Sequence, residues 1–170
     1  VARITQGRIL LKLEPVDVAK VVGVAVEMSR PLIKAREHEL TVTVPSAPLT
    51  VHGDCARVAQ ILANLLNNAA KFTEPKGRIA LGVEEEGTEV VFRVRDSGMG
   101  IPKNMLGSIF ELFIQGDRSL DRAQGGLGIG LTIVRRLVNM QGGSVQVYSD
   151  GAQKGSEFVV RLPRAEVGRA

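Results

Sequence analysis

The feature that constrains the fold most is a helical repeat of apolar residues between positions 54 and 72. The apolar side chains recur at i, i+3, i+4, i+7, i+8 and i+11, namely at Val58, Ile61, Leu62, Leu65, Leu66 and Ala69. An α-helix places these positions on one face. Asp54 precedes the repeat and is a favourable N-cap residue. The sequence therefore predicts an amphipathic helix from about Asp54 to Phe72.

Weaker patterns on both sides of this helix predict further helices and strands. After a candidate N-cap at Asp17, helical spacing of apolar residues predicts one helix face made of Val18, Val21, Val22, Ala25 and Met28. Alternating or short apolar runs predict strands over 39–44, 49–51, 78–86, 89–95, 144–148 and 157–162. A last helix over 127–141 begins in a glycine-rich stretch and stops at Gly142-Gly143.

The order of these elements indicates the fold class. Helix, strands, helix, hairpin, loop, helix and hairpin follow one another, and the loop-rich region 96–126 contains a short helical stretch near 103–113. This order predicts an α/β (α+β) two-layer sandwich, in which helices cover one face of an open mixed sheet. A chain of 170 residues fits one domain. We expect that domain over 14–163, with 1–13 as the tail of an upstream helix and 164–170 as a polar tail.

Composition and charge exclude several classes of protein. No apolar run approaches the roughly 20 residues that span a bilayer, and no signal peptide is evident, so a cytoplasmic domain is expected. One cysteine, Cys55, cannot form an internal disulfide. The net charge of +4 fits an anionic ligand or a merely solvated surface. Aromatic residues make up 4% of the chain and the basic residues are spread out, so no nucleic-acid partner is expected.

A polar strip runs beside the apolar face of the predicted 54–72 helix. Asn64, Asn68 and Lys71 fall at i, i+4 and i+7, so they face one way. An amide oxygen is a reasonable ligand for Mg²⁺, and a lysine one turn away can meet phosphate oxygens. The alternative from the residues alone is a solvated helix face.

Two glycine-rich segments are the other candidates for a binding site. DSGMGIP, over 96–102, follows a strand directly, and the acceptor-only carboxylate of Asp96 would select a ligand that offers an N–H donor, such as the amino group of adenine. The alternative is an ordinary Asp-Gly turn. GGLGIGL, over 125–131, leads into a helix, where free N–H groups favour a phosphate chain. It lacks the Gly-Lys-Ser/Thr of a Walker A loop and the leading strand of a dinucleotide site, and a flexible lid anchor is its alternative.

Taken in order, these segments resemble the histidine kinase branch of the ATPase family that includes gyrase, the heat-shock chaperone ATPases and the mismatch-repair ATPases. The stretch 57–73 is similar to the N box of that family, 96–101 to its first glycine box and 125–134 to its second. IFELFIQGD, over 109–117, resembles the phenylalanine box, and KGSEF, over 154–158, resembles the last glycine-containing box. The resemblance covers roughly 14–163 and implies a Bergerat-type fold with a mostly antiparallel sheet.

The resemblance also implies a binding site for ATP and Mg²⁺. Asn68 would be the Mg²⁺ ligand, and Asn64 and Lys71 would be catalytic residues that also contact the nucleotide. Asp96 would accept a hydrogen bond from the amino group of adenine. The remaining nucleotide-binding positions that the boxes imply are Phe72, Gly98, Gly100, Ile101, Gly126, Leu127, Gly128, Ile129, Gly130, Leu131 and Ser156. Phe110 and Phe113 would pack a lid or, equally well, the core.

The same resemblance predicts the type of reaction. Relatives that hydrolyse ATP carry a glutamate where this chain has Asn64, and an amide cannot accept a proton from water. We therefore expect transfer of the γ-phosphoryl group to a histidine on an upstream dimerisation domain, and from there to the receiver domain of a response regulator. The parent protein would be a homodimer. His38 and His52 lack the setting of such an acceptor and are expected to be ordinary packing or surface residues.

Two other functions stay open from the sequence. One is a nucleotide-sensing module that binds ATP or ADP without transferring phosphate. The other is a serine kinase of the anti-sigma type, which shares these boxes. Leu127 also departs from the family, because threonine often stands there and offers a hydroxyl near the phosphates.

Overall fold

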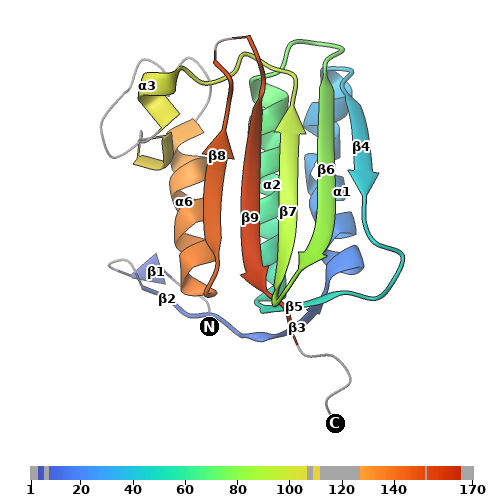
Figure 1. Cartoon of the computed structure of the whole chain (residues 1–170), viewed down its shortest axis with the longest axis vertical. Coiled ribbons are helices and arrows are strands. Elements are labelled where there is room, and N and C mark those ends of the chain that lie inside the picture. Colours follow the sequence, from blue (N-terminus) through green and yellow to red (C-terminus); the bar gives the residue numbers. More distant parts are fainter. Residues whose placement is uncertain (1–3, 6–7, 107–108, 112–126, 152, 166–170) are drawn as a thin grey trace.

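The computed structural model describes residues 4–5, 8–106, 109–111, 127–151 and 153–165. These residues form a two-layer α/β sandwich, shown face-on in Figure 1, which confirms the predicted fold class. Gly126 and Phe113 lie outside the described residues, as do the other members of the 112–126 segment.

The main sheet has five strands in the order β4-β6-β7-β9-β8. β4 pairs with β6 in parallel, and the other three pairs are antiparallel. The strands are β4 (Glu39–Thr43), β6 (Arg78–Glu86), β7 (Glu89–Asp96), β8 (Ser144–Tyr148) and β9 (Ser156–Pro163). The sheet is therefore mixed and mostly antiparallel, as predicted.

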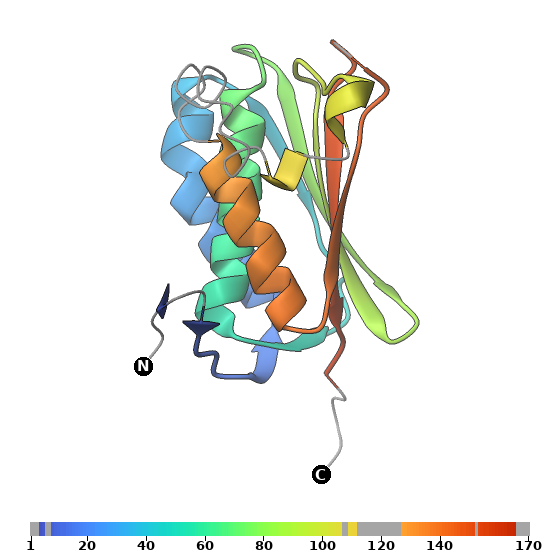
Figure 2. The ribbon, with the colours of Figure 1, turned by 90° about the vertical axis from the view of Figure 1, so that its left-hand side faces the viewer.

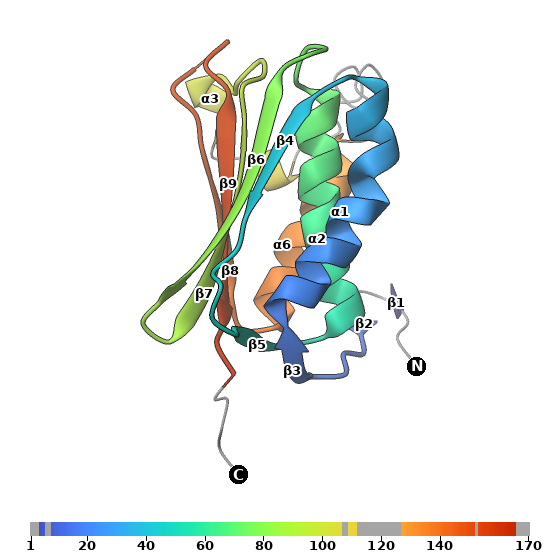
Figure 3. The same cartoon turned by 90° about the vertical axis from the view of Figure 1, so that its right-hand side faces the viewer.

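Three helices cover one face of this sheet (Figures 2 and 3). They are α1 (Val18–Ala35), α2 (Cys55–Lys71) and α6 (Leu127–Met140). Asp17 and Asp54 are the N-caps of α1 and α2, because each side chain accepts a hydrogen bond from a backbone N–H of the first turn. α6 ends as predicted: Gly142 has a φ of +82°, and the N–H of Gly143 donates to the carbonyl of Val138 at 3.0 Å.

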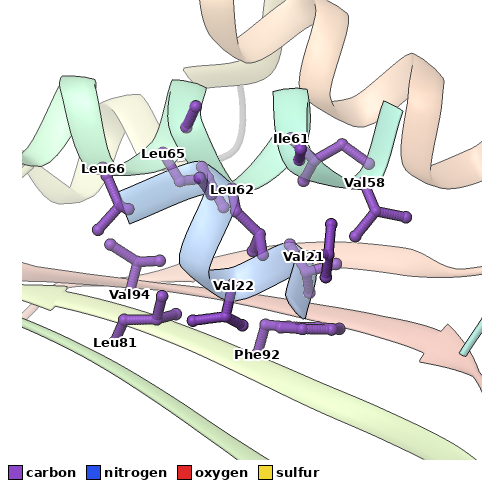
Figure 4. Packing of buried hydrophobic residues seen from close by; sticks show 14 of the residues in the cluster. Val21, Val22, Val58, Ile61, Leu62, Leu65, Leu66, Leu81, Phe92 and Val94 are labelled. Carbon is purple, nitrogen blue, oxygen red and sulfur yellow. The ribbon is translucent and has the colours of Figure 1, made fainter. Parts of the chain in front are cut away.

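The core lies between the helices and the sheet. All six apolar positions of the predicted α2 stripe are buried, and Leu62, Leu65 and Leu66 have no exposed surface. Figure 4 shows α2 side chains above Leu81, Phe92 and Val94 of the sheet, with Val21 and Val22 of α1 beside them. The alternation predicted for β7 is also confirmed, because Val90, Phe92 and Val94 point inward.

A second, two-stranded sheet closes the end of the sandwich where α1 and α2 begin. β3 (Glu14–Asp17) pairs antiparallel with β5 (Thr50–Gly53). The segment after β7 contains α3 (Lys103–Leu106) and the short 3₁₀ helix η1 (Ile109–Glu111). Within the described ranges, no helix has the length and apolar character that crossing a bilayer requires.

Two expectations from the sequence are wrong. The described residues of segment 1–13 include no helix; instead β1 (Ile4–Thr5) pairs with β2 (Arg8–Ile9), in keeping with the β-branched residues Ile4, Thr5 and Ile9. Met28 is 53% exposed and does not join the buried face of α1. Ten positions after Val18, it lies about 80° from that residue around the helix, whereas Ser29 lies in line with it and is buried.

Candidate functional site

A cavity opens where α2 ends and β7 runs into the following loop. Both elements end at the upper end of the sandwich in Figure 1. The cavity has a volume of about 160 Å³. Six predicted site residues line it, namely Asn68, Phe72, Asp96, Gly100, Ile101 and Ser156. The other lining residues are Ala69, Met99, Pro102, Met105, Ile109 and Phe158. The cavity is thus largely apolar, with three polar side chains.

Asp96 is the one carboxylate in this lining. The last residue of β7, it is only 8% exposed. Its Oδ1 accepts a hydrogen bond from the backbone N–H of Gly98 at 2.8 Å, and its Oδ2 accepts one from Ser156 Oγ, also at 2.8 Å. Burial raises the pKa of Asp96 above its ordinary value of 3.8, and these two hydrogen bonds oppose the rise. Each carboxylate oxygen has two lone pairs, so acceptor capacity remains for a ligand that donates an N–H.

Two glycines let the loop after β7 pack against its neighbours. A Cβ on Gly98 would clash with the carbonyl oxygen of Phe72, and one on Gly100 would clash with the carbonyl oxygen of Gly151. Gly100 also has a φ of +74°, a conformation that favours glycine. Gly100 lines the cavity, whereas Gly98 fixes the approach of the loop to the end of α2. Both glycines thus allow close approach between backbone segments of the chain.

The polar strip of α2 is only partly in the cavity. Asn68 is 6% exposed and lines the cavity, and its Nδ2 has no hydrogen-bond partner among the described residues. Asn64 and Lys71 are half-buried on the same helix and are not among the lining residues. The structure therefore brings Asn68, and not the whole strip, together with Asp96.

The predicted phosphate-binding stretch begins α6. The backbone of Leu127, Gly128, Ile129 and Gly130 forms the first turn of that helix. Leu131 has no exposed surface and its side chain belongs to the core, so only its backbone could meet a ligand. Phe110 packs edge-on against Phe158, with ring centroids 6.0 Å apart, and so connects η1 with the cavity wall. Its predicted packing role is confirmed.

Several residues of the site were not among the binding residues predicted from the sequence. Met99, Met105 and Ile109 supply apolar lining from the segment after β7. Ser149 accepts a hydrogen bond from the N–H of Ile101 at 3.0 Å and donates one to the carbonyl of Gly155 at 2.7 Å. A serine beside Asp150-Gly151 is a common turn signal. Its contact with a loop 48 positions earlier depends on the tertiary fold.

The two histidines match the prediction of ordinary roles. His38 is 9% exposed, and its ring packs against the turn after α2, whereas His52 is exposed on β5. Among the described residues, no group of three or more His, Cys, Asp or Glu side chains could hold a metal ion.

The family model of the "histidine kinase-, DNA gyrase B-, and HSP90-like ATPase" matches residues 53–166. The circadian input-output histidine kinase CikA of Synechococcus elongatus is 46% identical over 110 residues, which are 65% of this chain and 14% of CikA. The solved structure of the mycobacterial sensor histidine kinase MprB is 30% identical with a TM-score of 0.76, and the match covers 92% of this chain and 100% of that one. Full-length ShkA, solved in complex with AMPPNP, is 36% identical with a TM-score of 0.77, over 95% of this chain and 33% of that one.

These similarities agree with the geometry of the site. The matched region contains α2 with Asn68, the loop after β7 with Asp96, and α6. The chain spans a minor part of the length of CikA and of ShkA, and all of the MprB chain. The chain belongs to the family of histidine kinase-, DNA gyrase B- and HSP90-like ATPases, in the branch formed by the catalytic domains of sensor histidine kinases.

Proposed function

We propose that this chain binds Mg-ATP in the cavity between α2 and the loop after β7, and that it transfers the γ-phosphoryl group to a histidine on a dimerisation domain outside these 170 residues. The observation that carries the proposal is the buried Asp96 carboxylate in a largely apolar cavity, held by Gly98 and Ser156.

The chemistry of the cavity favours adenine over guanine. Apolar side chains such as Met99, Ile101 and Phe158 suit a flat heterocycle. Asp96 offers only acceptors when ionised, so it matches the exocyclic amino group of adenine. Guanine presents an acceptor at the corresponding position, and its carbonyl would face the carboxylate without a hydrogen.

Asn68 is the residue that would hold Mg²⁺. Its amide lies buried in the cavity, where Nδ2 has no partner among the described residues and so can donate a hydrogen bond to a ligand. The amide oxygen Oδ1 is the atom that would ligate the ion. Mg²⁺ is commonly held by one or two protein oxygens together with phosphate oxygens, and a single amide fits that pattern. When bound, the ion would neutralise part of the negative charge of the phosphates. Asn64 and Lys71, on the same helix, would lie next to the phosphates.

Transfer rather than rapid hydrolysis follows from the residues of α2. Asn64 is an amide at the position where a general base would act on water, and an amide has no basic group to take the proton. The protein's contribution to transfer is then to position ATP and to stabilise its charge, which accounts for most of the catalysis in phosphoryl transfer. The first turn of α6, with Gly126 before it, would direct its N–H groups toward the phosphates.

The partners follow from this reaction. We propose an upstream histidine-bearing dimerisation domain in a homodimeric parent protein, and the receiver domain of a response regulator as the next acceptor. The catalytic domain would cover 14–163. We also propose a cytoplasmic location, which agrees with the free, exposed thiol of Cys55.

The test is to mix the chain with the purified histidine-bearing domain of its parent protein and γ-labelled ATP. We expect a phosphate label on that domain that is stable in base and lost in acid, as expected of phosphohistidine. ATP binding without any transfer would instead support a nucleotide-sensing module. A label on serine, stable in acid, would contradict the assignment to histidine.

A further inference from the structure

The turn that follows α2 is held by two side chains from the end of α1. The carbonyl oxygen of Thr73 accepts hydrogen bonds from Nε and Nη2 of Arg36, at 3.3 and 2.9 Å. Nε2 of His38 lies 3.0 Å from the same oxygen and 3.0 Å from the carbonyl oxygen of Glu74. We name Arg36, His38 and the Thr73 carbonyl the carbonyl clamp.

The position of the Thr73 carbonyl explains why these residue types occur here. α2 ends at Lys71, so the carbonyls of Thr73 and Glu74 lie beyond the helix and need hydrogen-bond donors from elsewhere. The Arg36 guanidinium donates two N–H groups to the Thr73 oxygen. Because both neighbours of His38 Nε2 are acceptors, that nitrogen must carry a hydrogen. Its Nδ1 is buried without a partner among the described residues, so the ring is positioned by Nε2.

The backbone ties the two segments together as well. The N–H of Lys76 donates to the carbonyl of Arg36 at 3.0 Å, and the N–H of Glu39 donates to the carbonyl of Gly77 at 2.9 Å. Glu37 and Lys76, one on each side of this junction, have φ values of +57° and +70°. Such conformations are unfavourable for residues other than glycine and persist where the surroundings hold them in place.

The clamp lies next to the contact between the two walls of the cavity. The carbonyl of Phe72, adjacent to Thr73, accepts a hydrogen bond from the N–H of Met99 at 3.0 Å, and both residues line the cavity. Gly98 has no room for a side chain against Phe72 and Thr73. A shift of the Thr73 carbonyl would therefore move the end of α2 relative to the loop that carries Asp96.

We propose that Arg36 and His38 are positioning residues of the nucleotide site. They do not line the cavity; through Thr73 and Phe72 they set the separation between the α2 wall, with Asn68, and the loop wall, with Asp96. This inference rests on the proposed placement of ATP in the cavity. Removing either donor leaves the Thr73 carbonyl with fewer partners, frees the Phe72–Met99 hydrogen bond to open, and weakens ATP binding.

Two measurements on the whole chain test the clamp. For Arg36→Ala and His38→Ala we expect ATP, titrated by calorimetry with Mg²⁺, to bind about tenfold more weakly. Without nucleotide, we expect hydrogen exchange of the Met99 amide to become about tenfold faster. His38→Gln keeps a side-chain N–H at similar reach and should restore both values toward those of the wild type.

Matched controls separate this role from a general loss of stability. Arg30→Ala removes an exposed arginine of α1 that pairs with Glu27, and His52→Ala removes an exposed histidine; both should leave ATP affinity and Met99 exchange unchanged. If the alanine variants of the clamp do not fold, Arg36→Lys provides the test. A lysine keeps the positive charge but cannot donate the two hydrogen bonds that Arg36 makes to the Thr73 carbonyl. It should weaken ATP binding and speed Met99 exchange several-fold.

The outcomes for the clamp and for the proposed function are distinguishable. If hydrogen exchange of the Met99 amide is unchanged in the clamp variants, the proposed positioning role of Arg36 and His38 is wrong. This holds whether or not ATP binds, because exchange is measured without nucleotide. Failure of the wild-type chain to bind ATP would overturn the proposed function and the clamp's role in nucleotide binding, whereas Met99 exchange would still show whether the clamp holds the two cavity walls. Lower thermal stability with unchanged ATP affinity and unchanged Met99 exchange would show a purely structural role and also overturn the clamp.

Discussion

Ser156 donates its hydroxyl hydrogen to Oδ2 of Asp96 at 2.8 Å, and the two residues are directly paired across β7 and β9. The sheet register thus fixes the orientation of the only carboxylate among the described residues of the cavity lining, although 60 positions separate the two residues in the chain. With Oδ1 held by Gly98, the carboxylate is oriented before any ligand arrives. Such preorganisation reduces the entropy lost on binding.

The raised pKa of Asp96 predicts a pH-dependent stability. Desolvation disfavours the charged form in the folded state, so the folded protein retains this proton at a pH where the unfolded chain has lost it. The contribution of Asp96 to the free energy of unfolding therefore falls as the pH rises from about 3.8 through the raised pKa. At neutral pH the folded protein bears the full free-energy cost of burying the charged carboxylate.

Asp96→Asn should remove the free-energy cost of burying a charged carboxylate and abolish the selection of adenine. At pH 7 we expect the variant to have a higher melting temperature than the wild type, with the difference shrinking as the pH falls through the raised pKa of Asp96 toward 3.8. ATP affinity should fall at least tenfold, because a buried donor–acceptor match is lost. Thermal unfolding at several pH values and calorimetric titration measure both effects. Asp150→Asn, at an exposed position, is the control, and a pH-independent difference in melting temperature would contradict the assignment.

Asn68→Ala should separate metal-dependent from metal-independent binding of ATP. We expect about a tenfold or greater loss of ATP affinity with Mg²⁺ present, and a much smaller loss when the metal is chelated. Asn67→Ala is the matched control, because Asn67 is the preceding residue of α2 and does not line the cavity. An equal loss with and without Mg²⁺ would remove Asn68 from the metal site and leave it as a wall of the cavity.

Gly98→Ala should disrupt the site through sterics alone. The added methyl group would clash with the Phe72 carbonyl, so the loop and the end of α2 must separate. We expect a loss of roughly 1–3 kcal/mol in the free energy of unfolding and a clear drop in ATP affinity. Gly23→Ala, in α1 with no atom within 4 Å of the new methyl group, should raise stability by about 1 kcal/mol and leave ATP affinity intact. Equal behaviour of the two variants in denaturant titrations would contradict the close approach at Gly98.

The elements that local patterns specify were predictable, and those that depend on distant contacts were not. The stripe from Val58 to Ala69 predicts α2 correctly because a period of 3.6 residues reports burial on one side. No local pattern predicts β3, which contains Pro15; a short edge strand tolerates proline. Met28 was misassigned because a hydrophobic residue near the stripe does not reveal that the sheet lies on the other side of the helix.

The candidate site likewise combines residues that sequence motifs predict with contacts that they do not. Asp96 and Asn68 lie in motifs whose order along the chain marks the family, and the structure places both in one cavity. The contacts that support them do not follow from the motifs. The hydrogen bond of Ser149 to Ile101 and the Arg36 contact with Thr73 join residues 48 and 37 positions apart. No periodicity or turn signal encodes such pairs.

The end of α2 opposite the cavity provides a test of stability that should leave binding untouched. Gln141 is 4% exposed; its Oε1 accepts a hydrogen bond from the N–H of Asp54 at 2.8 Å, and its Nε2 donates to the carbonyl of Leu137 at 3.0 Å. Oδ2 of Asp54 also accepts the N–H of Lys12 at 2.9 Å, so this junction joins the N-terminal segment, α2 and α6.

Gln141→Leu fills the same space without these hydrogen bonds and leaves the N–H of Asp54 buried and unpaired. We expect a loss of about 1–3 kcal/mol in the free energy of unfolding, seen as a lower urea midpoint with an unchanged slope. α2 has 17 residues and is therefore about 25 Å long, so ATP affinity at its other end should stay at the wild-type value. Asn139→Leu, exposed two residues earlier, is the control and should be nearly neutral. A fall in ATP affinity with Gln141→Leu would mean that the two ends of α2 are coupled, contrary to this prediction.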